Sequence, residues 1–288
     1  MKTSHIITSY FLRFLKKCFS NLSPRKRFYI SSRLGSIFYN YLSIRKKQAR
    51  KNILKAFPQL DFNQIEKILK NTYLNFCHNF IELVSFPKSY KNIQIKVKGE
   101  RILQSFLKQK KGIVFITAHF GAWEILGQWV ASHVPLFVGV AQKQKNKGAH
   151  DFFINQRELA GTKHIIRGES IKLMYKVLSN NGLLGLVSDQ DAKKKGIFVN
   201  FFGTPASTPR GAALFHLNTK APLLLGVCFK EDFQKYHIHF KAIDTKNKNI
   251  EGITQEYTNQ LETYIKQYPD QYFWFHRRWK TKKHEKIN

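Results

Sequence analysis

Cysteine and acidic residues are both scarce in this chain of 288 residues. Its three cysteines, Cys18, Cys77 and Cys228, are isolated from one another. They form no Cys-x-x-Cys pair and no Cys/His cluster, so we predict a reducing compartment, no disulfide, no metal and no cofactor. Asp and Glu number 18 against 49 Lys and Arg, which gives a net charge of +31. This imbalance predicts an anionic partner.

The first 60 residues contain 14 Lys and Arg and no acid. Apolar side chains recur there at three- and four-residue spacing, beside Arg13, Lys16 and Lys17. This pattern predicts amphipathic helices that lie in a membrane interface and are drawn to anionic lipid headgroups. Core-facing helices with a solvated basic face are the alternative. The two apolar stripes are Ile6, Ile7, Tyr10, Phe11, Phe14, Leu15, Cys18 and Phe19, then Phe28, Ile30, Leu34, Ile37, Phe38, Tyr41 and Leu42.

Long apolar runs are missing from this amino-terminal region. Arg13 and the pair Thr8-Ser9 interrupt the ~18–20 apolar residues that an ordinary spanning helix needs. No small-residue cleavage site follows, which argues against a signal peptide. A short, tilted helix that dips into the bilayer remains open, and the basic excess favours the cytoplasmic side. We therefore predict a membrane-attachment region at 1–60 and an α/β domain at 61–288.

The rest of the chain alternates between strand and helix patterns, which predicts a mixed, mostly parallel sheet flanked by helices. Short apolar runs predict strands at 93–97, 113–117, 136–140, 164–166, 183–188, 198–201, 222–229 and 236–243. Helical spacing predicts helices at 65–84, 123–130, 149–160, 170–180, 208–218 and 254–267.

The segment His119-Phe-Gly-Ala-Trp-Glu124 directly follows the predicted buried strand 113–117. A histidine at the carboxyl end of a sheet strand lies where open α/β sheets bind ligands. We expect Glu124, in the first turn of the next helix, to turn back and orient the imidazole as a general base. His164/Glu169 and His239/Asp244 share the spacing but lack this context. A structural histidine is the competing interpretation for His119.

A second acidic segment, Ser188-Asp-Gln-Asp191, closes the buried strand 183–188. In a parallel sheet it would reach the same edge as His119. Its two acids could orient a base, bind a cation or cap a turn.

Five motifs in order resemble the lipid A biosynthesis (late, secondary) acyltransferase family, within the His-x4-acid glycerolipid acyltransferase group. The resemblance runs from about residue 30 to 281. The motifs are Arg50-Lys-Asn-Ile-Leu-Lys-Ala-Phe-Pro58, the His119 segment, Ser188-Asp-Gln-Asp191, Phe198-Val-Asn-Phe-Phe-Gly203 with Thr208, and Tyr268-Pro-Asp-Gln-Tyr-Phe-Trp-Phe-His-Arg-Arg-Trp-Lys280.

This resemblance implies an O-acyltransferase on the cytoplasmic face of the bacterial inner membrane. The implied donor is acyl carrier protein, and the implied acceptor is a hydroxyl of a lipid A precursor or related glycolipid. Arg157 and Asp191 are its implied substrate-binding residues. The family usually carries a basic residue where this chain has Gln142, so Lys143 or Lys145 is expected to supply that charge.

Two other functions remain open. One is acyl transfer from acyl coenzyme A to another glycolipid or a lysophospholipid. The other is nucleic-acid binding, which the charge permits, although the chain has no nucleic-acid-binding motif and that function leaves His119 unexplained. A covalent acyl-enzyme is not expected, because no Gly-x-Ser-x-Gly elbow is present.

Overall fold

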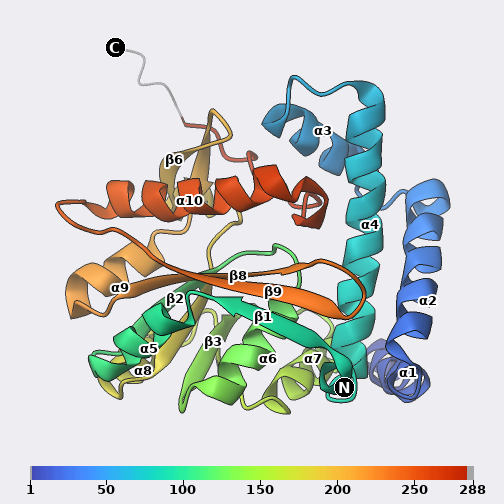
Figure 1. Ribbon diagram of the computed structural model, residues 1–288, viewed down its shortest axis with the longest axis horizontal. Helices are drawn as coiled ribbons and strands as arrows, with labels where there is room; N and C mark the ends of the chain where they lie inside the picture. Colours follow the sequence, from blue (N-terminus) through green and yellow to red (C-terminus); the bar gives the residue numbers. More distant parts are fainter. Residues whose placement is uncertain (1, 284–288) are drawn as a thin grey trace.

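The computed structural model describes residues 2–283, and its centre is an open sheet of seven strands (Figure 1). The strand order is β1-β9-β8-β2-β5-β3-β4. All neighbours run parallel except β8 and β9, which form an antiparallel pair. The strands are β1 (Gln94–Lys98), β2 (Ile113–Thr117), β3 (Phe137–Ala141), β4 (Lys163–Ile166), β5 (Leu183–Val187), β8 (Leu223–Lys230) and β9 (Lys235–Ala242). The predicted mixed, mostly parallel α/β fold is confirmed.

Helices cover both faces of the sheet, because successive side chains of a strand point to opposite faces. Ile113 and Phe115 of β2 belong to one hydrophobic cluster, while Val114 and Ile116 belong to another. The first cluster includes residues of α5 (Glu100–Lys108) and α6 (Trp123–His133). The second includes residues of α8 (Ile171–Ser179), α9 (Gly211–Thr219) and α10 (Ile250–Gln267).

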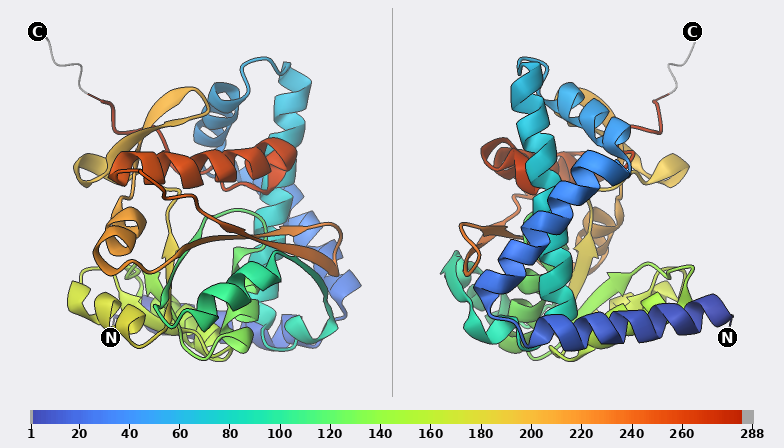
Figure 2. Two further views of the ribbon diagram at one scale, coloured as in Figure 1. Left: turned by 60° about the vertical axis from the view of Figure 1, so that its left-hand side comes forward. Right: turned by 90° about the vertical axis from the view of Figure 1, so that its right-hand side faces the viewer.

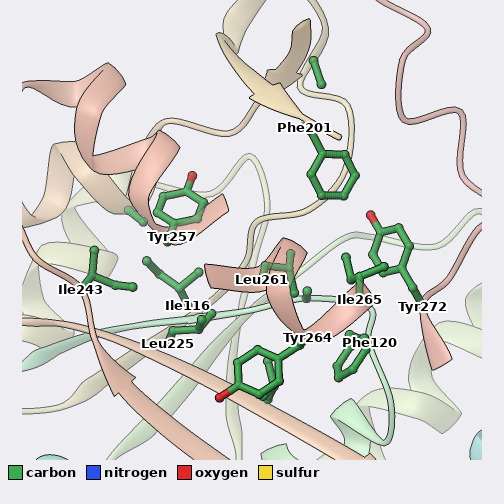
Figure 3. Packing of buried hydrophobic residues seen from close by; sticks show 14 of the residues in the cluster. Ile116, Phe120, Phe201, Leu225, Ile243, Tyr257, Leu261, Tyr264, Ile265 and Tyr272 are labelled. Atoms are coloured by element: carbon green, nitrogen blue, oxygen red, sulfur yellow. The ribbon is translucent and has the colours of Figure 1, made fainter. Parts of the chain in front are cut away.

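The layer under α10 supports the loop that carries His119. Leu261 and Tyr264 of α10 pack over Ile116 and Leu225 of the sheet, with Phe120 at the edge of the same group (Figure 3). Phe120 is 1% exposed. The residue after His119 is therefore fixed in the core, while His119 itself lies at the sheet edge.

The amino-terminal helices pack around α4 (Phe62–Ser85), which stands beside the sheet (Figures 1 and 2). Helix α2 (Pro24–Ile37) runs along α4, and at Gly35 a Cβ would lie 2.7 Å from the Leu74 Cα. The helix faces α4 through its buried residues Arg27, Ser31 and Gly35. Its predicted apolar stripe is not buried, and Ile37, Tyr41 and Leu42 of that stripe are exposed. A short π-helix (Phe38–Leu42) and α3 (Lys46–Ala56) lie near the start of α4, and α1 (Thr3–Ser20) lies near its end.

Helix α1 packs on α7 (Lys147–Glu158) along one side only. Leu12 is buried there, and Lys16 Nζ donates to Gln156 Oε1 at 2.6 Å. The stripe Ile7, Tyr10, Phe11 and Phe14 points away and is 56–70% exposed. Between residues 2 and 283 no helix combines the length and apolar content that a membrane crossing needs.

Two elements differ from the sequence expectations. Segment 198–201 is a strand, but it belongs to a separate hairpin of β6 (Ile197–Phe201) and β7 (Thr204–Thr208) rather than to the main sheet. Neither β7 nor α5 was predicted. Three short 3-10 turns complete the structure at Tyr90–Asn92, Lys193–Lys195 and Pro269–Gln271.

Candidate functional site

The candidate site lies at the carboxyl edge of the sheet, where β2 and β5 end side by side. Thr117 is in register with Val187, so each strand ends level with the other. His119 follows β2 by two residues and Asp189 follows β5 by two residues. Their side chains meet, with His119 Nδ1 2.9 Å from Asp189 Oδ1. The expectation that the two motifs share one edge is confirmed.

This geometry fixes the tautomer of His119. An ionised carboxylate only accepts hydrogen bonds, so Nδ1 carries the hydrogen and donates it to Asp189. Nε2 is left with the lone pair, as a general base requires. The His119 side chain is 28% exposed, whereas that of Asp189 is 2% exposed. A substrate can therefore reach the imidazole but not the carboxylate behind it.

The electrostatics of the pair agree with these roles. Burial lowers the pKa of His119, but the charge and hydrogen bond of Asp189, together with the charge of Glu124, raise it above its ordinary value. Burial raises the pKa of Asp189, yet the charge of His119 and its hydrogen bonds leave that pKa below its usual range. Asp189 is thus held as an anion beside the imidazole.

Backbone hydrogen bonds tie down the loop that presents His119. Phe273 N–H donates to the His119 carbonyl at 2.9 Å, and Gly121 N–H donates to the Gln271 carbonyl at 2.8 Å. Gly121 has φ +57°, and a Cβ there would lie 1.9 Å from the Cys228 carbonyl oxygen of β8. Glycine is required at this position both for the backbone angle and for the close approach.

Glu124 does not contact the imidazole, and the expectation that it orients His119 is corrected here. Arg157 Nε and Nη2 donate to its two carboxylate oxygens at 2.9 and 2.6 Å. Trp123 Nε1 adds a hydrogen bond at 3.2 Å. The reason lies in how the elements pack. Glu124 lies in the first turn of α6 and faces the last turn of α7, where Arg157 lies. The parallel register of β5 with β2 brings Asp189 to His119 Nδ1 instead.

The Glu124–Arg157 pair is itself partly buried, with side-chain exposures of 13% and 30%. Burial raises the pKa of Glu124, but the Arg157 charge and the hydrogen bonds lower it by more than burial raises it. The pKa of Glu124 is therefore below its ordinary value. Glu124 therefore acts on His119 through its charge, from a distance, and holds Arg157 in place at the same edge.

The other predicted binding residues lie around the site but not in contact with His119. Asp191 is half-buried and accepts a hydrogen bond from Thr281 Oγ1 at 3.0 Å. Lys143 and Lys145 are exposed in the loop after β3, whose carboxyl end lies at the same sheet edge. Their proposed contact with an acceptor phosphate stays a prediction. His164 and His239 do not belong to the His119–Asp189 pair.

The last of the five motifs, at residues 268–280, supplies residues whose positions were not predicted from the sequence. Arg278 is 3% exposed and donates to the Ser207 carbonyl and to Thr208 Oγ1 of β7. The Asp189 charge raises and the His119 charge lowers the pKa of His276, although burial is the largest influence and lowers it. His276 lies three residues after Phe273, whose N–H binds the His119 carbonyl.

Asn52, from the motif at 50–58, is 3% exposed and donates to the Trp274 and His276 carbonyls, both at 2.6 Å. Asn52, His276 and Arg278 all lie in the five motifs, and the fold brings those motifs together. Membership of a motif was therefore the sequence signal that could have identified them.

Aromatic rings form the wall beside the imidazole. The rings of Trp123 and Phe273 lie 5.5 and 5.8 Å from the His119 ring. Phe76 of α4 lies 5.6 Å from Phe273 and is 39% exposed. These rings form an apolar surface beside the imidazole.

Comparison with known proteins places the chain in a family. A model described as bacterial lipid A biosynthesis acyltransferase matches residues 2–281. The chain is 28% identical over 204 residues to a phosphatidylinositol mannoside acyltransferase of Mycobacterium tuberculosis, which covers 68% of this chain and 63% of that relative. The chain therefore spans less than two thirds of the length of that relative.

Two further relatives cover more of both chains. A lipid A biosynthesis palmitoleoyltransferase of Escherichia coli is 23% identical over 261 residues, 88% of this chain and 85% of its own. A lipid A biosynthesis acyltransferase of Haemophilus influenzae is 26% identical over 265 residues, 86% and 82% of the two chains. The family match extends through α1, beyond the motifs that first indicated it. The chain belongs to the bacterial lipid A biosynthesis acyltransferase family.

Proposed function

We propose that this protein is an O-acyltransferase that moves a fatty acyl chain from a thioester donor to a hydroxyl of a membrane glycolipid. The observation that carries the proposal is the His119–Asp189 pair at the sheet edge of a chain that belongs to an acyltransferase family. The relatives are named for acyl transfer to lipid A and to phosphatidylinositol mannoside, which are both glycolipids. Among these acceptors we favour a lipid A precursor or a related glycolipid.

The proposed reaction begins when His119 Nε2 takes the proton of the acceptor hydroxyl. The resulting oxygen nucleophile attacks the thioester carbonyl and forms a tetrahedral intermediate. The carbon–sulfur bond then breaks, and the imidazolium returns its proton to the leaving thiolate. Asp189 stabilises the imidazolium between these two steps, because its carboxylate is fixed 2.9 Å from Nδ1.

Arg157 is proposed to bind the developing oxyanion or a phosphate of the acceptor. Its Nε and Nη2 atoms are bound by Glu124, and among residues 2–283 no acceptor contacts Nη1. The guanidinium is thus held by one side and presents the other side to a ligand. A preorganised donor of this kind stabilises charge that develops in the transition state.

Direct transfer is favoured over an acyl-cysteine intermediate. Burial raises the pKa of the Cys77 thiol to about 11 and also raises that of Cys228, so neither is a thiolate at neutral pH. Cys18 is exposed on α1, outside the strand ends and loops that form the sheet edge. The acyl chain would then pass from donor to acceptor without a covalent acyl-enzyme intermediate.

Membrane attachment is proposed through the exposed stripe of α1. Ile7, Tyr10, Phe11 and Phe14 share one side of the helix, opposite the side that packs on α7. Such a stripe beside Arg13 and Lys17 suits the interface of an anionic leaflet. We propose that the protein attaches to the cytoplasmic face of the bacterial inner membrane.

The mechanism is tested by His119→Ala in a purified transfer assay. Loss of the base should lower kcat by roughly 10²–10⁴-fold. His133→Ala is the matched control, because His133 lies at the other end of α6 and stacks on Trp129. The control should keep near wild-type transfer, and an unimpaired His119→Ala variant would refute the mechanism.

The donor and acceptor are tested in the same assay. Acyl carrier protein and coenzyme A carrying the same fatty acyl chain should be compared with a lipid A precursor as acceptor, and then with a lysophospholipid. We expect higher kcat/KM with the carrier protein and the glycolipid. Preference for acyl coenzyme A and a lysophospholipid would favour the alternative acyltransferase.

A further inference from the structure

Helix α3 carries an exposed row of positive charge. Lys47, Lys51 and Lys55 are spaced by four residues, so they lie on one face of the helix, and all three are exposed. We call these three residues the α3 lysine ridge. The helix itself contains no acid. Glu66 of the adjacent α4 does not neutralise the ridge, because Arg50 and Tyr39 bind it at 2.6 Å each.

The ridge lysines repel one another. Like charges four residues apart on a helix are destabilising. Burial is the largest influence that lowers the pKa of Lys55, and the charges of Lys51 and Lys282 lower it further. Positive charge therefore continues from α3 onto the carboxyl-terminal segment, where Lys55 Nζ lies 5.3 Å from the centroid of the Trp279 ring. A surface of this kind favours a negatively charged partner.

The α3 lysine ridge is connected to the catalytic loop by a row of aromatic rings. The centroid of the Phe273 ring lies 5.8 Å from that of His119 and 5.3 Å from that of Phe275. The Phe275 and Tyr73 ring centroids lie 4.7 Å apart. The ring centroids of Tyr73 and Tyr39 lie 6.0 Å apart, and Lys46 Nζ of α3 lies 3.6 Å from the centroid of the Tyr39 ring.

Polar contacts join α3 to the same segment. Asn52 donates to the Trp274 and His276 carbonyls, as described above, and Arg45 Nη1 donates to the Phe275 carbonyl at 3.2 Å. A partner bound at the ridge would therefore stand next to the segment that flanks His119.

The position of α3 favours a protein partner over the membrane. α1 and α3 lie at opposite ends of α4 (Figures 1 and 2). α1 contacts α4 near Val84, whereas Arg50 of α3 pairs with Glu66. These positions are 18 residues apart, or roughly 27 Å along the helix axis. With α1 in the bilayer interface, the ridge would lie at the far end of α4 from it.

A hollow beside α3 adds an apolar surface. It has a volume of about 620 Å³, and Phe57, Leu60, Ile68 and Pro269 line it together with Lys67 and Lys266. Apolar side chains between lysines suit an amphipathic helix whose polar side is acidic. Carrier proteins that bring an acyl thioester on a flexible arm present such acidic helices.

We infer that the α3 lysine ridge and the adjacent hollow dock the acidic carrier protein that delivers the acyl thioester. The inference rests on the proposed acyl transfer and adds to it the place where the donor binds. The membrane-bound acceptor would approach from the α1 side and the protein-bound donor from the α3 side, with His119 between them.

The test is charge reversal on the ridge with a matched control. The variant K47E/K51E/K55E is compared with K108E/K110E/K111E, which changes the same charge at exposed lysines before the amino end of β2. Each protein is assayed with one fatty acyl chain presented either on acyl carrier protein or as a pantetheine thioester. The neutral variant K47Q/K51Q/K55Q reports the loss of attraction without added repulsion.

We expect the ridge variant to raise KM for acyl carrier protein by at least about tenfold, and K47Q/K51Q/K55Q to raise it less. KM for the pantetheine thioester should change by less than about twofold, and the control should leave both values unchanged within that range. An unchanged KM for the carrier protein, or an equal rise with the control, would overturn the inference. So would loss of flotation on phosphatidylglycerol vesicles by the ridge variant, which would assign the ridge to the membrane. Failure of the wild type to use either donor would instead defeat the proposed function.

Discussion

At the residue scale, the proposed mechanism depends on which basic side chain each carboxylate contacts. Asp189 is bound to the imidazole of His119, and Glu124 is bound to the guanidinium of Arg157. Both acids are held below their ordinary pKa by these partners, although burial opposes this. In the proposed mechanism, Asp189 assists proton transfer, and Glu124 holds the Arg157 guanidinium that would bind substrate.

The pH dependence of transfer tests the Asp189 contact. In the proposed mechanism the neutral form of His119 is the base, and its pKa lies above the ordinary value of about 6.5. Activity should thus be low in acid and rise with pH through an apparent pKa above that value. Asp189→Asn removes the main upward contribution, so the rise should move to lower pH. The plateau should fall by about 10²–10⁴-fold, because the Nδ1 hydrogen loses its anionic acceptor.

Asp191→Asn is the control for this measurement, because Asp191 contacts Thr281 and not the imidazole. It should leave the pKa of the profile in place, whatever its effect on acceptor binding. A profile of Asp189→Asn that coincides with the wild type would contradict the assigned contact.

The glycine after Phe120 provides a test of the loop geometry. Gly121→Ala should lower the free energy of unfolding by roughly 1–2 kcal/mol for its positive φ, and by about 1–3 kcal/mol more for the overlap with Cys228. Gly203→Ala is the control, because Gly203 has φ +71° and a Cβ there meets no atom within 4 Å. Urea unfolding should show the larger loss at Gly121, and equal losses would contradict the close approach.

Sequence reasoning reached the two halves of the site but not the contact between them. His119 and Asp189 each follow a run of buried apolar residues, so a common sheet edge could be predicted. Which acid meets Nδ1 depends on the register of β2 with β5, and local spacing carries no information about that register. Arg157 was expected in the site only from the family resemblance. Its pairing with Glu124 depends on how α7 packs beside α6, which local spacing does not reveal either.

At the scale of elements, amphipathic patterns predicted helices better than they predicted what each helix contacts. Helix α2 shows the pattern of an interfacial helix, yet it packs along α4, and its Arg27 is buried in an ion pair with Glu82 at 2.8 Å. Segment 204–208 escaped prediction because Pro205 and small residues give it no apolar alternation. It becomes a strand only by pairing with β6.

The exposed stripe of α1 predicts how the protein attaches to membranes. The triple variant Ile7→Ser, Phe11→Ser, Phe14→Ser should lose flotation on anionic liposomes, because each large apolar side chain adds up to about 1.5–3 kcal/mol when buried. Each nearby basic residue adds about 1 kcal/mol, so high salt alone should not release the wild type. Ile171→Ser with Leu173→Ser, two exposed apolar residues of α8, is the control. Full release of the wild type by salt would contradict an apolar anchor.

At the scale of the whole molecule, three surfaces follow one another along α4. The stripe of α1 lies at one end, the His119 loop touches α4 through the hydrogen bond from Asn79 Nδ2 to the Gly121 carbonyl, and the α3 lysine ridge lies at the other end. In the proposed function, the membrane, the chemistry and the donor protein would each use a separate part of the fold. The basic residues beside the α1 stripe and those of the α3 lysine ridge would then bind anionic partners.

The central claim is direct transfer of an acyl chain to a glycolipid hydroxyl by His119, and mass spectrometry of a purified reaction tests it most directly. Purified protein is incubated with acyl carrier protein bearing one fatty acyl chain and with a lipid A precursor. The masses of both the lipid and the protein are then measured. The account predicts a lipid heavier by one acyl group in ester linkage, no acyl group on the protein, and almost no product with His119→Ala. An unchanged lipid, or an acylated protein that precedes the product, would contradict it.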